Sequence, residues 1–225
     1  MGVSLAALLL LPPIVQDQYY LQFADIRTMC GVPNGWNVLS NISFIVIGAI
    51  GLVQFRNDAT TIVIFAGIFM TGFGSSYFHW SPDNDGLFWD RLPIALAFMA
   101  LLAAAIQERL DAKAGAMLLW PLLVIAIASL LLWRQYGDLR LYAWVQFFPL
   151  LTIPVMFLLC TPKYTGTIYW IAAAAIYAVA KVFEHFDSAI FSIGHIVSGH
   201  TLKHLIAAAA CFAILRYFQT RQLIT

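Results

Sequence analysis

The sequence carries little charge and little cysteine. Only 10% of its 225 residues are charged and 62% are hydrophobic, whereas soluble domains carry roughly 25% charged residues. The formal net charge is +1 with no block of like charges, so nothing indicates a nucleic acid or an acidic partner. Three cysteines, Cys30, Cys160 and Cys211, predict neither a disulfide framework nor a Cys-rich zinc site. This composition argues against a soluble fold and for a membrane protein.

Long apolar runs provide the main structural signal. About 20 apolar residues of helix are needed to cross a hydrocarbon core of about 30 Å. Seven runs have this character: Asn37–Phe55, Ala59–His79, Leu87–Ile106, Ala114–Trp133, Leu141–Cys160, Thr167–Phe183 and His200–Phe218. They lack the period-two alternation of barrel strands, so helices are expected. The sequence therefore predicts an all-α integral membrane protein with a seven-transmembrane-helix bundle over residues 37–218.

The two ends of the chain are short. Residues 1–36 are expected to form a partly interfacial N-terminal segment, and residues 219–225 a C-terminal tail. The run Val3–Val15 is apolar but contains Pro12 and Pro13, and no Lys or Arg precedes it, which matches a signal peptide poorly. A short interfacial helix is the favoured interpretation; a cleaved signal and an eighth span are the alternatives.

Basic residues in the loops predict the orientation. Alternating the loops across the bilayer places Arg56, Arg109, Lys113, Lys163 and Arg221 on one side, and Arg27, Arg134 and Arg140 on the other. The positive-inside rule then assigns the C-terminus to the cytoplasm.

With this topology, strongly polar residues converge at one end of the bundle. They are Asn37, Ser40, Asn41, Ser75, His79, Asp90, His200 and His204, all at the non-cytoplasmic ends of their helices. Polar groups at membrane depth are costly and usually mark function. One buried site built from several helices is therefore expected here.

Three of the histidines form a candidate metal site. His200 and His204 are four residues apart and project from one helix face, and His79 ends a helix at the same depth. Three protein ligands leave a fourth tetrahedral position for water, which is typical of catalytic zinc. Iron, nickel and copper also accept imidazole. The alternative is that His200 and His204, at the start of the run His200–Phe218, only bond to neighbouring carbonyls.

Asp90 and Ser75 are the candidate catalytic residues. An ionised Asp90 at this depth needs a partner, which a metal-bound water or a ligating imidazole would provide; an ion pair with Lys203 or a helix-dipole position is the alternative. Ser75 precedes His79 by four residues and shares its face, so it could stabilise an oxyanion or hold the water. A serine in a membrane helix also often bonds to its own backbone.

The set Ser75-x-x-x-His79, Asp90 and His200-x-x-x-His204 resembles the alkaline ceramidase family, within a membrane hydrolase superfamily that also contains adiponectin-type receptors. The stretch from Asn37 to Asn41 similarly resembles the Asn-x-x-Ser-Asn of ceramidases. The resemblance spans all seven predicted helices.

This resemblance implies a zinc-dependent hydrolase that cleaves the amide of ceramide-like membrane lipids to a sphingoid base and a fatty acid. His79, His200 and His204 would bind zinc, Asp90 would activate the water, and Ser75 would assist. Eukaryotic relatives also bind Ca²⁺ through an acidic cluster before helix one. Here the corresponding Glu position is Asn34, with Asp25 nearby, so calcium regulation is doubtful.

Two other functions remain as alternatives. An adiponectin-receptor-like membrane receptor or lipid-binding protein would share the metal site without turnover. A retinal protein would use Lys203, but that lysine lies only about 5 Å from the start of its span. Among the remaining polar residues, Arg91 is expected to reach the headgroups and Lys203 to turn partly away from the histidines. The cluster of Glu184, His185, Asp187 and His195 is interpreted as a solvated loop, with a site entrance as the alternative.

Overall fold

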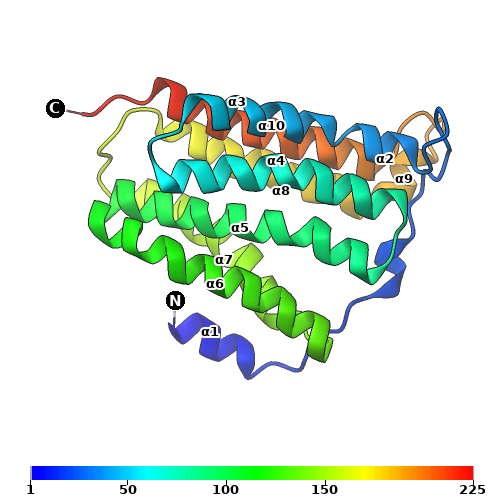
Figure 1. The fold of residues 1–225 in the computed structure, drawn as a ribbon, viewed down its shortest axis with the longest axis horizontal. Helices are drawn as coiled ribbons and strands as arrows, with labels where there is room; N and C mark the ends of the chain where they lie inside the picture. The colour runs from blue at the N-terminus through cyan, green and yellow to red at the C-terminus, as the bar shows by residue number, and fades with distance from the viewer. Residues whose placement is uncertain (1, 225) are drawn as a thin grey trace.

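A computed structural model describes residues 2–224, and these residues form helices and loops without a strand. The elements are α1 (Gly2–Leu9), the 3₁₀ helix η1 (Gln18–Leu21), α2 (Gly35–Leu39), α3 (Ile42–Gln54), α4 (Ala59–Trp80), α5 (Asn84–Arg109), α6 (Ala112–Tyr136), α7 (Arg140–Leu159), α8 (Thr167–His185), α9 (Asp187–Phe191) and α10 (Gly199–Thr220). Figure 1 shows the long helices running side by side along one axis.

Seven of these segments are long and apolar enough to cross a membrane: α2 with α3, α4, α5, α6, α7, α8 and α10. The predicted all-α seven-helix bundle is therefore confirmed, and the protein is an integral membrane protein. The predicted ends lie within three residues of the observed ones for every helix, because polar or turn-forming residues bound each apolar run.

The first span is interrupted, although the sequence predicts one continuous helix from Asn37. The break falls at Ser40 and Asn41, between α2 and α3. The hydroxyl of Ser40 donates to the carbonyl of Asn37 at 3.0 Å, and the Asn41 amide donates to the same carbonyl at 2.8 Å. These side chains replace the backbone donor that a regular helix would supply. The break brings Ser40 into the candidate site.

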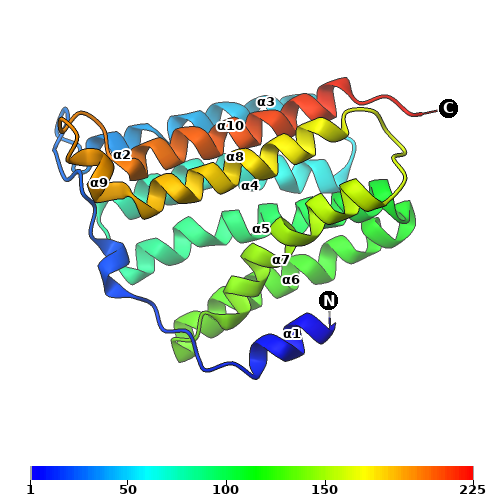
Figure 2. The ribbon, with the colours of Figure 1, turned by 180° about the vertical axis from the view of Figure 1, so that it is seen from behind.

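Helix α1 lies on the outside of the bundle beside α6 and α7 (Figure 2). The indole of Trp144 on α7 donates to the hydroxyl of Ser4 at 3.1 Å. At 1.5 Å per residue, the eight residues of α1 extend only about 12 Å, which is less than half the thickness of a hydrocarbon core. From α1 the chain runs along the end of the bundle through η1 to α2.

Not every span lines the central cavity. Helices α3, α4, α5, α7, α8 and α10 each contribute residues to its wall, whereas α6 contributes none of the lining residues. Helix α6 packs instead on the outer side of α5 and α7. Six spans therefore form the chamber and the seventh supports it.

Candidate metal centre and hydrolase site

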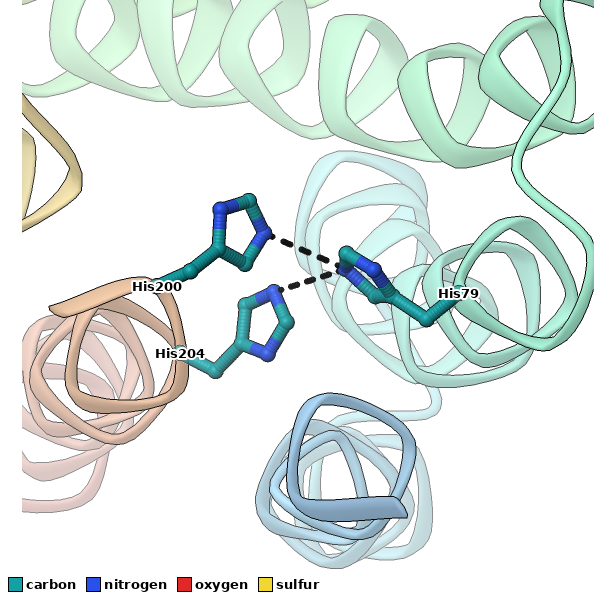
Figure 3. A group of neighbouring side chains, drawn as sticks. All are labelled: His79, His200 and His204. Carbon is teal, nitrogen blue, oxygen red and sulfur yellow. Dashed lines mark hydrogen bonds between the residues drawn. The ribbon is translucent and has the colours of Figure 1, made fainter. Parts of the chain in front are cut away.

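The three predicted ligand residues meet at one end of the bundle. His79 lies in the last turn of α4, while His200 and His204 lie in the first two turns of α10. Figure 3 shows both α10 rings pointing at the ring of His79. The Nε2 atom of His79 lies 3.2 Å from Nε2 of His204 and 3.3 Å from Nε2 of His200. All three side chains are buried.

These two distances match those between ligands of a tetrahedral metal ion, and the third pair of ligand atoms lies within 4.8 Å. Zinc binds imidazole nitrogen at about 2.0–2.1 Å, which places two tetrahedral ligand atoms about 3.3–3.4 Å apart. Three clustered Nε2 atoms cannot all satisfy one another, because each neutral ring offers either a proton or a lone pair at that atom. A metal ion would accept all three lone pairs. The cluster can therefore hold a metal ion.

Ser40 contacts His204 from the first span. Its hydroxyl lies 2.7 Å from His204 Nδ1 and 3.0 Å from the Asn37 carbonyl, so when the hydroxyl donates to that carbonyl its oxygen can accept the proton of Nδ1. With Nδ1 protonated, Nε2 of His204 carries the lone pair and faces the other two histidines. Such an outer hydrogen bond is a common feature of metal-bound histidine.

Residues other than the two histidines cap the start of α10. The hydroxyl of Ser198 accepts from the backbone N–H of Thr201 at 3.1 Å, and the carboxylate of Asp187 accepts from the backbone N–H of His200 at 2.7 Å. Both His200 and His204 rings are thereby free to point into the cluster. The N–H groups at the start of α10 are therefore capped by Ser198 and Asp187.

Phe23 covers the outer side of the triad. Its ring centroid lies 4.6 Å from that of His79 and 5.0 Å from that of His200. This apolar lid shields the cluster from the bundle end, while His204 borders the central cavity. Sequence reasoning missed Phe23, because a single aromatic residue in a nonhelical segment has no periodicity that reveals its neighbour.

Asp90 and Ser75 lie together beside the histidines. Both line the cavity with His204, and the Ser75 hydroxyl lies close to the Asp90 carboxyl. The neighbouring Ser76, rather than Ser75, bonds back to its own helix, with its hydroxyl 2.7 Å from the carbonyl of Gly72. Lys203 pairs with Glu184 at 3.2 Å. Asp90 thus faces the chamber with a hydroxyl group beside it.

A glycine sets the contact between Ser75 and Asp90. A Cβ atom at Gly74 would collide with the backbone of Trp89, so α4 and α5 approach this closely only because Gly74 lacks a side chain. We expect Gly74→Ala to separate the two helices and to lower turnover by up to about 10²-fold, since a misplacement of about 1 Å can cost that much. Turnover per folded molecule measures this effect.

Gly115→Ala is the matched control. A Cβ atom there would also meet α5 backbone, 2.7 Å from the Ala103 carbonyl oxygen, but at the opposite end of that helix. It should lower thermal stability without changing turnover per folded molecule. Equal losses of turnover in both variants would contradict a specific role for the Gly74 contact.

The cavity beside the triad is apolar along most of its length. The part of its α10 wall from His204 to Ile214 spans about 15 Å at 1.5 Å per residue. Half of a hydrocarbon core is also about 15 Å. Leu101 on α5, Ile153 on α7 and Trp170 on α8 line the deeper part. The chamber thus has a polar end at the histidines and room for a hydrocarbon chain behind it.

Charged residues form the remainder of the polar end. Glu184 accepts from Lys203 at 3.2 Å and from the Tyr20 hydroxyl at 3.1 Å, and it also pairs with Lys181. Burial raises the pKa of Tyr20 well above its usual range, so this hydroxyl stays protonated and donates. The solvated-loop interpretation is therefore wrong for Glu184, because α8 extends through His185 and carries it into the cavity wall.

Two further expectations need correction. Lys203 also lines the cavity, since its long side chain reaches Glu184 across the α8–α10 contact. Arg91 is only 8% exposed, so it does not reach the headgroups. In contrast, His185 and His195 are exposed, as a solvated segment predicts.

Asp25, an acidic residue of the N-terminal segment, is neutralised by an arginine. Arg27 donates to both carboxylate oxygens, at 2.7 Å and 2.6 Å, and these bonds hold the pKa of the Asp25 carboxyl below its usual range. The amide of Asn34 donates to the carbonyl of His79 at 2.8 Å. Asn34 therefore ties the segment to α4.

Comparison with known proteins gives one informative match. None of the curated proteins matches the sequence. The family model described as Ceramidase matches residues 31–225, which includes every membrane span, the histidine triad, Ser75 and Asp90. The chain therefore belongs to the ceramidase family.

Proposed function

We propose that this protein is a zinc-dependent intramembrane hydrolase that cleaves the amide bond of ceramide-like lipids to a sphingoid base and a fatty acid. The observation that carries the proposal is the triad of Nε2 atoms beside the Ser75–Asp90 pair at the polar end of an apolar chamber. Membership of the ceramidase family supports an amide substrate in a membrane lipid.

The ligand set supports zinc. His79, His200 and His204 would hold the ion with nitrogen donors and no thiolate, and three ligands leave one position open for reaction. When bound, zinc supplies a Lewis acid that lowers the pKa of coordinated water to about 7 and polarises a carbonyl. Iron, nickel and copper also accept imidazole, so the metal content must be measured.

The chain's own residues would supply positioning and proton transfer. The deep apolar wall would hold the acyl chain and bring its amide to the polar end of the cavity. Asp90 would take a proton from the attacking water and pass it to the leaving amine. Ser75, held against Asp90, would stabilise the negative charge that develops on the amide oxygen. Phe23 would exclude bulk water from the bundle end.

Metal analysis and lipid turnover test the proposal together. Protein purified without chelator should contain about one zinc per chain and should release fatty acid from a labelled ceramide. An adiponectin-receptor-like receptor or lipid-binding protein would bind the metal and lipid without turnover. Stoichiometric zinc with no hydrolysis across a panel of amide and ester lipids would favour that alternative.

We also propose that the C-terminus is cytoplasmic and that the metal site lies nearer the opposite membrane face. Asn84 and Lys163 are exposed, and the α4–α5 and α7–α8 connections beside them lie at opposite ends of the bundle (Figure 1). In a variant with the three native cysteines replaced by serine, a cysteine at position 84 should label from outside and one at 163 from the cytoplasm. Labelling of both from one side would contradict the orientation.

A further inference from the structure

Arg91 is a buried cation without an acceptor. Its guanidinium carbon lies 4.8 Å from the ring centroid of Trp133, 4.9 Å from that of Tyr142 and 5.6 Å from that of Tyr20. The buried Nη1 atom has no hydrogen-bond partner, and no carboxylate among residues 2–224 forms an ion pair with the side chain. Aromatic rings therefore surround a group whose N–H donors remain unused.

Such an arrangement is costly unless another molecule completes it. A guanidinium offers five N–H donors in one plane, and aromatic contacts compensate its charge but accept little hydrogen bonding. Buried polar groups in native proteins are almost always paired, so an unpaired one requires an explanation. Arg91 lines the same cavity as Asp90 and His204. A ligand in that cavity is the available source of acceptor oxygens.

The charges around the cavity indicate the kind of acceptor. Three basic side chains and two carboxylates line it: Arg91, Lys181, Lys203, Asp90 and Glu184. Glu184 is paired with both lysines, which leaves Arg91 as the basic group without an ion pair. The lining has one positive charge in excess, and a divalent ion at the triad would increase it. An anionic oxygen group would compensate this excess, whereas a neutral headgroup would not.

We propose that Arg91 determines substrate specificity by binding an acidic oxygen group, a carboxylate or a phosphate, on the headgroup of the N-acyl lipid. This inference rests on the proposed function, in which the amide lies beside Asp90. Asp90 and Arg91 both line the cavity, and we place the acidic group within a few bonds of the amide nitrogen so that one substrate reaches both. An N-acyl amino acid has its carboxylate there, and a phosphorylated sphingoid base has its phosphate there. Guanidinium binds either group through two parallel hydrogen bonds.

A matched pair of probes tests the proposal. N-palmitoylglycine and N-palmitoylethanolamine share an acyl amide and differ in a carboxylate against a hydroxyl. The wild-type protein should bind N-palmitoylglycine at least about tenfold more tightly than N-palmitoylethanolamine. Arg91→Met should remove this preference by lowering the affinity for N-palmitoylglycine by about 10–100-fold. Arg91→Lys, which keeps the charge but loses the planar fork, should retain part of it. Ceramide and its phosphate ester form a second pair that tests phosphate as the acidic group.

Arg134→Met is the control variant, because Arg134 also lies over an aromatic ring, Phe88 at 5.4 Å, but is exposed and paired with Asp85. It should leave the preference unchanged. Equal weakening of acid and neutral probes in Arg91→Met would show a structural role and overturn the proposal, as would a wild-type protein without preference for either acid. Equilibrium binding and kcat/KM are measured in parallel, because binding tests the role of Arg91 and kcat/KM tests the proposed hydrolase function. If Arg91→Met loses the preference for acidic probes but no lipid is hydrolysed, only the proposed function is contradicted.

Discussion

Replacing His200 by alanine should remove the metal and reduce turnover by at least about 10³-fold. Two histidines would remain, and His200 Nε2 lies 3.3 Å from His79 Nε2 in the cluster. Loss of the ion removes charge stabilisation worth several kcal/mol, and each 1.36 kcal/mol corresponds to a factor of ten in rate. Metal content per folded chain and ceramide hydrolysis measure the two losses separately.

His185→Ala is the appropriate control, because His185 is an exposed histidine at the end of α8. It should keep both zinc and turnover. The His200 variant must also be compared by thermal unfolding, since a bound ion stabilises the folded state. With excess zinc removed, wild-type protein should unfold at a higher temperature than the variant. Full zinc occupancy in a folded His200→Ala protein would show that the triad is not the metal site.

The sequence was sufficient to predict the seven spans, because the length and apolar character of a membrane helix are local properties. It also predicted that His79 and His204 share a depth, since α4 ends and α10 begins on the same side. Periodicity then placed His200 on the face of His204. These inferences need only helix geometry and the alternation of loops.

The supporting contacts depend on how the helices pack, which no local pattern contains. Ser40, which contacts His204, lies at the break in the first span. The break has a recognisable cause in the Asn37–Asn41 stretch, whose side chains bond to one backbone carbonyl. A continuous helix was nevertheless expected, since hydropathy does not report side-chain competition for backbone acceptors.

Buried charge was the largest source of error. Arg91 and Glu184 lie near span ends, where basic and acidic side chains usually reach water. The N-terminal segment closes over this end instead, with Tyr20 contacting both residues. Nothing in the sequence of residues 10–34 predicts that path, because the segment contains neither a long helix nor an apolar repeat.

The role of Asp90 separates a hydrolase from a passive metal site. Asp90→Asn keeps the size of the side chain and its ability to accept from Ser75, but it removes the basic oxygen. Zinc should stay bound, because the three imidazoles that hold it are unchanged. Turnover should fall by roughly 10²–10⁴-fold, the usual contribution of general acid–base assistance, with little change in substrate binding.

The alternatives for Asp90 predict other combinations of the same measurements. If its carboxylate bound the metal directly, the asparagine variant would lose zinc together with activity. If it mainly stabilised the fold against the charge of Arg91 or Lys203, the melting temperature would fall while the folded fraction kept its rate. Retained zinc, retained folding and near-normal turnover would exclude Asp90 from the mechanism. Only the combination of intact metal, intact fold and lost turnover assigns it the proton, because the substitution then removes basicity and nothing else on which the site depends.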